Sequence, residues 1–267
     1  MAVFLEQRSK AEALFEECIA FTGKNDFSDT AGKMKKIKED LNRKLCILTC
    51  GEARRGKSSL LGALLEDSGL FPVDIAVTTC MVTMVSYGEQ EKVTVILQDN
   101  SMKEIRRQEI EAYVTEKKNS DNKKQAKLLM IETPNPRLKD GLTFVDTPGV
   151  GSLNPEHSVA TIECLPQADV VLFVSDSQKP LTETEISFLK QVKKYSSNIL
   201  FLLTKKDLCS DALEYEKIME DNRDKISQAT GLGRDKIPYV AVSSALKLSA
   251  KGQSNPALAK RQLRSSN

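Results

Sequence analysis

Hydrophobic spacing changes character near residue 44 of this 267-residue chain. Apolar residues from Ala11 to Ile19 recur at i, i+3, i+4, i+7 and i+8, which predicts one apolar stripe along a helix. The polar stretch that begins at Gly23 ends this helix, and the spacing within Met34–Leu41 predicts a second amphipathic helix. Residues 1–43 are therefore expected to form a helical segment that precedes the main fold.

From Lys44 onward, short apolar runs bounded by turns alternate with helical stretches. The pattern predicts strands at 45–49, 81–87, 93–97, 128–131, 142–145, 170–174, 199–203 and 237–242. Helices are predicted at about 57–66, 105–117, 155–165, 182–195 and 211–229, and Thr182 with Glu185 forms a capping-box signature. This alternation indicates an α/β fold over residues 44–250, with a mainly parallel sheet and helices on both faces.

Two highly polar stretches depart from this pattern. Residues 99–126 are expected to be an insertion that contains a helix and then the flexible run 117–122. Residues 251–267 are Ser-, Gln- and Asn-rich with several basic residues, and we expect a helical or flexible tail that stops before a further stalk.

Composition narrows the class of protein. The chain is 40% hydrophobic and 28% charged, as in a folded globular protein, and its net charge of +2 gives no support for binding nucleic acid. It contains neither a signal-peptide pattern nor the ~18 apolar residues that cross a membrane, so a cytoplasmic location is expected. The six cysteines include no C-x-x-C pair and His157 is the single histidine, which argues against a zinc site or a histidine-based triad.

The strongest motif is G-x-x-x-x-G-K-S over residues 51–58, between a predicted strand and a predicted helix. Backbone N–H groups of such a loop surround phosphates, Lys57 reaches the β- and γ-phosphates, and Ser58 binds Mg²⁺. The other residues predicted to line the nucleotide here are Gly51, Glu52, Ala53, Arg55, Gly56 and Ser59.

A second motif, D-T-P-G, follows the strand predicted at 142–145. Asp146 suits Mg²⁺ binding, and the backbone N–H of Gly149 can sense the γ-phosphate. A threonine must also close over the metal, and we assign this role to Thr79, with Thr78 as the alternative. Thr79 also precedes a predicted strand, so a purely structural role is the competing interpretation.

The sequence T-K-K-D after the strand 199–203 indicates which base is bound. Asp207 can accept hydrogen bonds from guanine N1–H and from the exocyclic amine, while Lys205 lies along the base. Thr204 opens this motif. The backbone of Ser243, Ser244 and Ala245, which follow the last predicted strand, completes the pocket around guanine O6. The motifs together predict a P-loop GTPase that uses GTP and Mg²⁺.

One residue expected of many GTPases is absent. Ras-type enzymes place a water-orienting glutamine directly after D-x-x-G, and this chain has Val150 there. His157 is more readily a structural residue than a replacement base. Hydrolysis must then orient its water through backbone groups, a monovalent cation or a partner molecule, which favours a GTPase completed by dimerisation.

These motifs together resemble the GTPase domain of the dynamin family, and most of all the bacterial dynamin-like proteins. The resemblance rests on Gly51–Leu61, Phe71–Ile75 with Thr78 and Thr79, Val145–Ser152, Leu165–Asp169 and Pro180–Thr182, and extends over about residues 45–250. It implies GTP hydrolysis stimulated by a homodimer of GTPase domains. It also implies coupling to a membrane-binding stalk, so that the full-length protein is peripherally membrane-associated. The N-terminal helices resemble the bundle-forming segment of that family.

The chain departs from the family at the phosphate-binding loop. Where the family often has a serine that helps to bind K⁺ or Na⁺, this chain has Arg54, and the preceding position is Ala53. Arg54 either supplies the positive charge itself or is a solvated surface residue. Two other functions stay open: a nucleotide-dependent scaffold that hydrolyses weakly, and a translation or ribosome-assembly GTPase.

Overall fold

The computed structural model describes residues 2–25, 27–41, 43–71, 81–115, 118–119, 122–150, 155–209 and 211–250. Thr78, Thr79 and the tail 251–267 lie outside these residues. The chain divides into two compact units, Met1–Lys44 and Leu45–Asn267.

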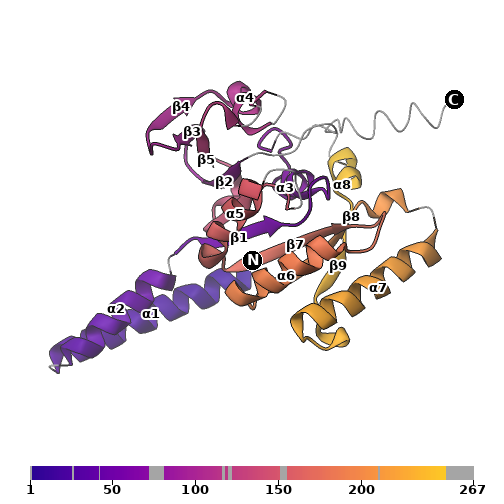
Figure 1. The fold of residues 1–267 in the computed structure, drawn as a ribbon. Coiled ribbons are helices and arrows are strands. Elements are labelled where there is room, and N and C mark those ends of the chain that lie inside the picture. The colour runs from indigo at the N-terminus through magenta and orange to yellow at the C-terminus, as the bar shows by residue number, and fades with distance from the viewer. Residues whose placement is uncertain are drawn as a thin grey trace. The chain divides into compact units, whose positions relative to one another are not determined.

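The first unit is a helical hairpin of α1 (Ala2–Lys24) and α2 (Ser28–Leu41), drawn in indigo and violet in Figure 1. The connection is fixed by backbone hydrogen bonds, since the Phe27 amide donates to the Thr22 carbonyl at 3.0 Å. An ion pair at 2.5 Å between Lys38 and Glu16 joins the two helices. Ala31 and Thr22 are buried in the hairpin.

The second unit is built on a nine-stranded sheet in the order β4-β3-β5-β2-β6-β1-β7-β8-β9. The strands are β1 (Leu45–Cys50), β2 (Val82–Tyr87), β3 (Lys92–Leu97), β4 (Met102–Ile105), β5 (Ala126–Thr133), β6 (Leu142–Asp146), β7 (Val170–Asp176), β8 (Ile199–Thr204) and β9 (Tyr239–Ala241). From β6 through β1, β7 and β8 to β9 the pairs are parallel, while β2 runs antiparallel to β6, and β3 antiparallel to both of its neighbours. The α/β class expected from the pattern is confirmed.

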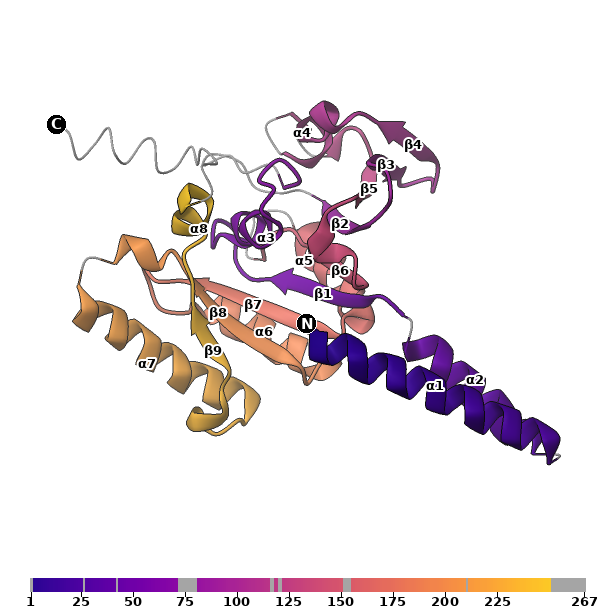
Figure 2. The same cartoon turned by 180° about the vertical axis from the view of Figure 1, so that it is seen from behind.

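Helices pack on both faces of the parallel half of the sheet (Figures 1 and 2). One face carries α5 (Pro155–Cys164), α6 (Glu183–Tyr195) and α7 (Ala212–Thr230), whose apolar residues join a core cluster with strand residues such as Leu48, Phe173 and Phe201. The other face carries α3 (Lys57–Leu65), where Leu60 packs on Leu172. The helix α8 (Ser244–Ala250) packs against α3. Strands buried on both faces explain the continuous apolar runs in the sequence.

The charged insertion differs from its expectation. The helix expected at 105–117 is reduced to a 3₁₀ turn at Arg107–Glu109 and one turn of α4 (Glu111–Val114), and β4 precedes them as an additional strand. Asn100 adopts a left-handed conformation with φ 62°, which lets the chain reverse so that β4 pairs with β3. Only Ile105 of β4 is buried, and a polar, one-sided edge strand has too little apolar signal to be distinguished from a loop.

No helix within the described ranges is long and apolar enough to cross a membrane.

Candidate functional site

Four loops meet at the carboxyl edge of the parallel strands, where ligands bind in open α/β sheets. They follow β1, β6, β8 and β9, and β1 lies between β6 and β7 in the sheet. These loops contain residues 51–56, 147–150, 205–208 and 243. The topology thus brings together motifs that are separated by up to about 190 residues along the chain.

The phosphate-binding loop is shaped by residues with positive φ. Gly51 has φ 144° and lies so close to the neighbouring strand that a Cβ would be 2.2 Å from the Val174 carbonyl oxygen. Arg54 (φ 64°) and Gly56 (φ 91°) are left-handed, and Gly56 is the N-cap of α3. The loop therefore turns tightly into the helix N-terminus, where backbone N–H groups favour anions.

The Lys57 side chain lies inside this loop and contacts its first residues. Its Nζ donates to the carbonyl oxygens of Gly51 and Glu52, both at 3.1 Å, and its side chain is buried. Burial lowers the pKa of Lys57, and the nearby Asp146 carboxylate only partly offsets this effect. An anion that enters the loop would restore the preference for the charged ammonium.

Ser58 and Asp146 form the oxygen pair expected to bind a metal. The Ser58 hydroxyl donates to Asp146 Oδ2 at 2.5 Å, and the Thr49 hydroxyl donates to Oδ1 at 3.2 Å. Burial raises the pKa of Asp146, while Lys57 and these hydroxyls act against it. A hydroxyl and a carboxylate are the hard oxygen donors that Mg²⁺ prefers, so the residues present fit this ion.

The loop after β6 touches the phosphate-binding loop directly. The Val150 amide donates to the Gly51 carbonyl at 3.1 Å, and a Cβ on Gly149 would be 2.4 Å from the Ala53 Cα. The Val150 side chain is 1% exposed and belongs to the core cluster. The position where a water-orienting glutamine would stand therefore faces the core.

The loops assigned to the base also lie together. Ser243 donates its hydroxyl to Asp207 Oδ1 at 2.6 Å, and the Lys206 amide donates to the Val242 carbonyl at 3.2 Å. The Lys205 backbone is left-handed with φ 59°, and its Nζ donates to the Arg54 carbonyl at 2.8 Å. Base loop and phosphate loop are thus hydrogen-bonded to each other.

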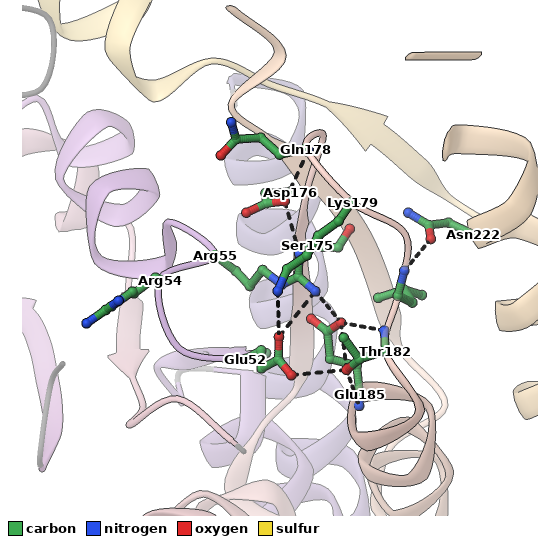
Figure 3. Close-up of polar contacts among 12 residues, drawn as sticks. Glu52, Arg54, Arg55, Ser175, Asp176, Gln178, Lys179, Thr182, Glu185 and Asn222 are labelled. Atoms are coloured by element: carbon green, nitrogen blue, oxygen red, sulfur yellow. Dashed lines mark hydrogen bonds and ion pairs between the residues drawn. The ribbon is translucent and has the colours of Figure 1, made fainter. Parts of the chain in front are cut away.

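Arg55 is the residue whose environment the motifs do not reveal. The sequence predicts that Arg55 lines the nucleotide, but its side chain is 1% exposed and forms ion pairs with Glu52, Asp176 and Glu185 (Figure 3). Only its main chain is left to line the phosphate loop. The neighbouring Arg54 is exposed, and its side chain extends away from this cluster. The sequence marks Glu185 as a residue of the capping box of α6, but it does not indicate that Glu185 contacts Arg55.

The fold, the phosphate loop and the two base loops define this class of protein as a P-loop G domain. The sequence matches the family model described as Dynamin family over residues 47–206. The chain belongs to the dynamin family.

Several relatives share this region. The chain is 31% identical over 211 residues to an uncharacterised protein of Caldicellulosiruptor sp.. The aligned region covers 79% of this chain and 52% of that protein. It is 29% identical to the isoniazid-induced protein IniA of Mycobacterium tuberculosis, over 88% of this chain and 36% of IniA. The bacterial dynamin-like protein of Nostoc punctiforme is 27% identical over 70% of this chain and 28% of its own length. The chain therefore spans about half or less of the length of these relatives.

The fold also matches a solved structure of an oligomerised bacterial dynamin pair, described as a mechanism for long-range sensing and tethering of membranes. The match has a TM-score of 0.72 at 19% identity and covers 92% of this chain and 47% of that one. At this identity the likeness concerns the fold.

Proposed function

We propose that this chain binds GTP with Mg²⁺ and hydrolyses it to GDP and phosphate, as the G domain of a dynamin-like protein. The observation that carries the proposal is the meeting of the phosphate loop with the Asp207–Ser243 contact at one edge of the sheet. A phosphate site alone would serve many nucleotides, whereas a carboxylate at the base loop selects for the paired donors of guanine.

Each residue of the site has a distinct role in this proposal. Lys57 would exchange its two carbonyl partners for phosphate oxygens, and its charge would offset theirs. Ser58 and Asp146 would hold Mg²⁺, which neutralises charge that develops between the β- and γ-phosphates. The Gly149 amide would contact the γ-phosphate, and Thr79 would close over it.

Hydrolysis needs further help because the apolar Val150 side chain is buried in the core and cannot orient a water molecule. We propose that two G domains complete the site by dimerising. Arg54 is exposed at the tip of the phosphate loop, and its guanidinium is always charged. Arg54 would therefore supply the positive charge that offsets the phosphates. A bound K⁺ or Na⁺ is the alternative source of that charge.

A role at membranes is proposed on the strength of the relatives. The N. punctiforme relative is named a dynamin-like protein, and the matched structure is described as sensing and tethering membranes. The chain would couple GTP turnover to membrane tethering or remodelling as a peripheral protein, with lipid contact made by stalk regions.

One alternative has support from a specific observation. Because the Val150 side chain is buried and no other water-orienting side chain is evident among the described residues of the phosphate loop, a nucleotide-dependent scaffold with weak hydrolysis is the second candidate.

Steady-state GTP turnover measured against protein concentration separates these functions. We expect turnover per molecule to rise cooperatively with concentration, and the Lys57→Ala variant to be inactive at every concentration. Tight GTP binding with flat, negligible turnover would favour the scaffold. Absence of GTP binding would contradict both.

A further inference from the structure

One buried carboxylate joins the phosphate loop to the base loop. Asp176, the last residue of β7, accepts from Arg55 Nη1 at 2.9 Å through Oδ1 and from Lys205 Nζ at 2.9 Å through Oδ2. The backbone N–H of Gln178 also donates to Oδ1 at 3.2 Å. The Asp176 side chain is 6% exposed, so these charges interact with little screening by solvent.

The other side of Arg55 is fixed to a helix terminus. Its Nη2 contacts Glu185 at 2.6 Å and Glu52 at 3.2 Å (Figure 3). Glu185 is fully buried and closes the capping box of α6, because its Oε2 also accepts from the Thr182 amide at 2.9 Å. The conformation of the phosphate loop is therefore tied to β7 and to the start of α6.

Lys205 ties the base loop to the same point. Besides Asp176, it contacts the Arg54 carbonyl, and the adjacent Thr204 hydroxyl donates to the Arg55 carbonyl at 2.5 Å. Burial would raise the pKa of Asp176, but Lys205 and Arg55 outweigh burial and hold that pKa below its ordinary value. The carboxylate is thus charged at neutral pH and can hold both cations.

From this geometry we propose that Asp176 and Arg55 are positioning residues that hold the phosphate loop and the base loop in fixed register, and thereby sharpen the selection of guanine. This proposal rests on the proposed function. In a rigid site, a base that lacks the exocyclic amine leaves one acceptor position of Asp207 without a hydrogen bond. The complex then loses the full binding free energy of that hydrogen bond. If the two loops move independently, the base loop can adapt to the poorer base.

The test compares the affinities of the full chain for GTP and for ITP, whose base lacks the exocyclic amine. Asp176→Asn keeps the shape of the side chain but loses the charge that both cations contact. We expect GTP affinity to fall about tenfold and the ratio of GTP to ITP affinity to fall about threefold or more, as for coupled neighbouring residues. A loss of folded protein lowers both affinities equally and leaves the ratio unchanged.

Two further variants separate positioning from folding. Arg55→Gln combined with Glu185→Gln removes a buried pair of opposite charges and keeps a residue type that supports the capping box. We expect this double variant to be more stable than Arg55→Gln alone and to show the same reduced ratio. The matched control is Arg107→Gln, since Arg107 also contacts two carboxylates, Asp67 and Glu91, outside the nucleotide edge. We expect it to keep the ratio of the unmodified chain.

A ratio for Asp176→Asn equal to that of the unmodified chain would overturn the proposal, as would a normal ratio in the double variant. Failure of the unmodified chain to bind either nucleotide would instead overturn the proposed function, and this inference with it.

Discussion

The two neighbouring arginines of the phosphate loop have opposite environments. Arg55 is buried among three carboxylates, while Arg54 is exposed and left-handed. Burial raises the cost of the Arg55 charge, yet its acidic partners keep its pKa above the ordinary value. The charge of Arg55 is therefore already balanced by the protein. We propose that the charge of Arg54, the other arginine of this loop, offsets the charge of the bound nucleotide.

The Arg54 proposal predicts an unusual response to salt. We expect GTP hydrolysis by the unmodified chain to be nearly the same in K⁺ and in a large organic cation, because the guanidinium supplies the charge. Arg54→Ser should be slower and should regain activity with K⁺ or Na⁺; removal of an arginine finger costs about 10³–10⁵ in rate. Steady-state assays of both proteins at high concentration in each salt test this. Strong K⁺ dependence of the unmodified chain would mark Arg54 as an ordinary surface residue.

Selection of the base is expected to depend on Asp207. In Asp207→Asn the amide presents a donor where guanine needs an acceptor, so GTP affinity should fall and preference should shift toward xanthosine triphosphate. An interaction of this kind accounts for about 1.5–3 kcal/mol, or roughly ten- to a hundredfold in affinity. Binding of both nucleotides to both proteins gives the result. Unchanged GTP affinity in the variant would exclude Asp207 from the base pocket.

At the scale of elements, the loop after β6 and the phosphate loop are packed too tightly to accept a side chain at Gly149. A Cβ there would be 2.5 Å from the Ala53 amide nitrogen and 2.4 Å from its Cα. We expect Gly149→Ala to lower the free energy of unfolding by about 1–3 kcal/mol. It should also weaken GTP binding more than GDP binding, because the Gly149 amide would be displaced from the γ-phosphate.

Thermal unfolding and nucleotide titration measure both effects. Gly32→Ala in α2 is the matched control, because a Cβ at Gly32 meets nothing within 4 Å and alanine favours a helix. Equal losses of GTP and GDP affinity in Gly149→Ala would mean that this amide does not sense the γ-phosphate.

The sequence predicts best the helices and strands whose buried apolar residues recur at a regular spacing. The strand expected at 199–203 is found at Ile199–Thr204, and the capping box at Thr182 is present with both of its hydrogen bonds. β4 was not predicted, because its exposed residues Met102, Lys103 and Glu104 resemble a loop. Short edge strands are decided by pairing with a neighbour, which a local pattern does not contain.

The site shows the same division. The motifs at 51–58, 146–149 and 204–207 are local, and the fold brings their loops to one edge. Glu52 is a local partner of Arg55. The other two partners could not be predicted, since Asp176 and Glu185 lie 121 and 130 residues away along the chain. Nothing in the sequence distinguishes Arg55, which is buried, from Arg54, which is exposed.

At the scale of the whole molecule, every described residue that we assign to the nucleotide belongs to the unit Leu45–Asn267, and none to the hairpin unit Met1–Lys44. Binding energy gained from the nucleotide should therefore stabilise the larger unit. This unit buries Lys57 and Asp146, whose pKa values are both displaced toward the neutral forms. A ligand that supplies phosphate and metal charges would relieve that cost.

We therefore expect GDP with Mg²⁺ to raise the melting temperature of the larger unit. At a hundred times the dissociation constant, binding adds about 2.7 kcal/mol to the free energy of unfolding. For a unit of this size the increase corresponds to about 5–10 °C. Chelation of Mg²⁺ with EDTA should reduce the shift, because Ser58 and Asp146 would lose the ion that links them to the phosphates. Calorimetry with and without EDTA measures this.

The Lys57→Ala variant, which lacks the ammonium in the phosphate loop, should show little shift in either condition. A full shift in that variant would mean that the nucleotide binds elsewhere.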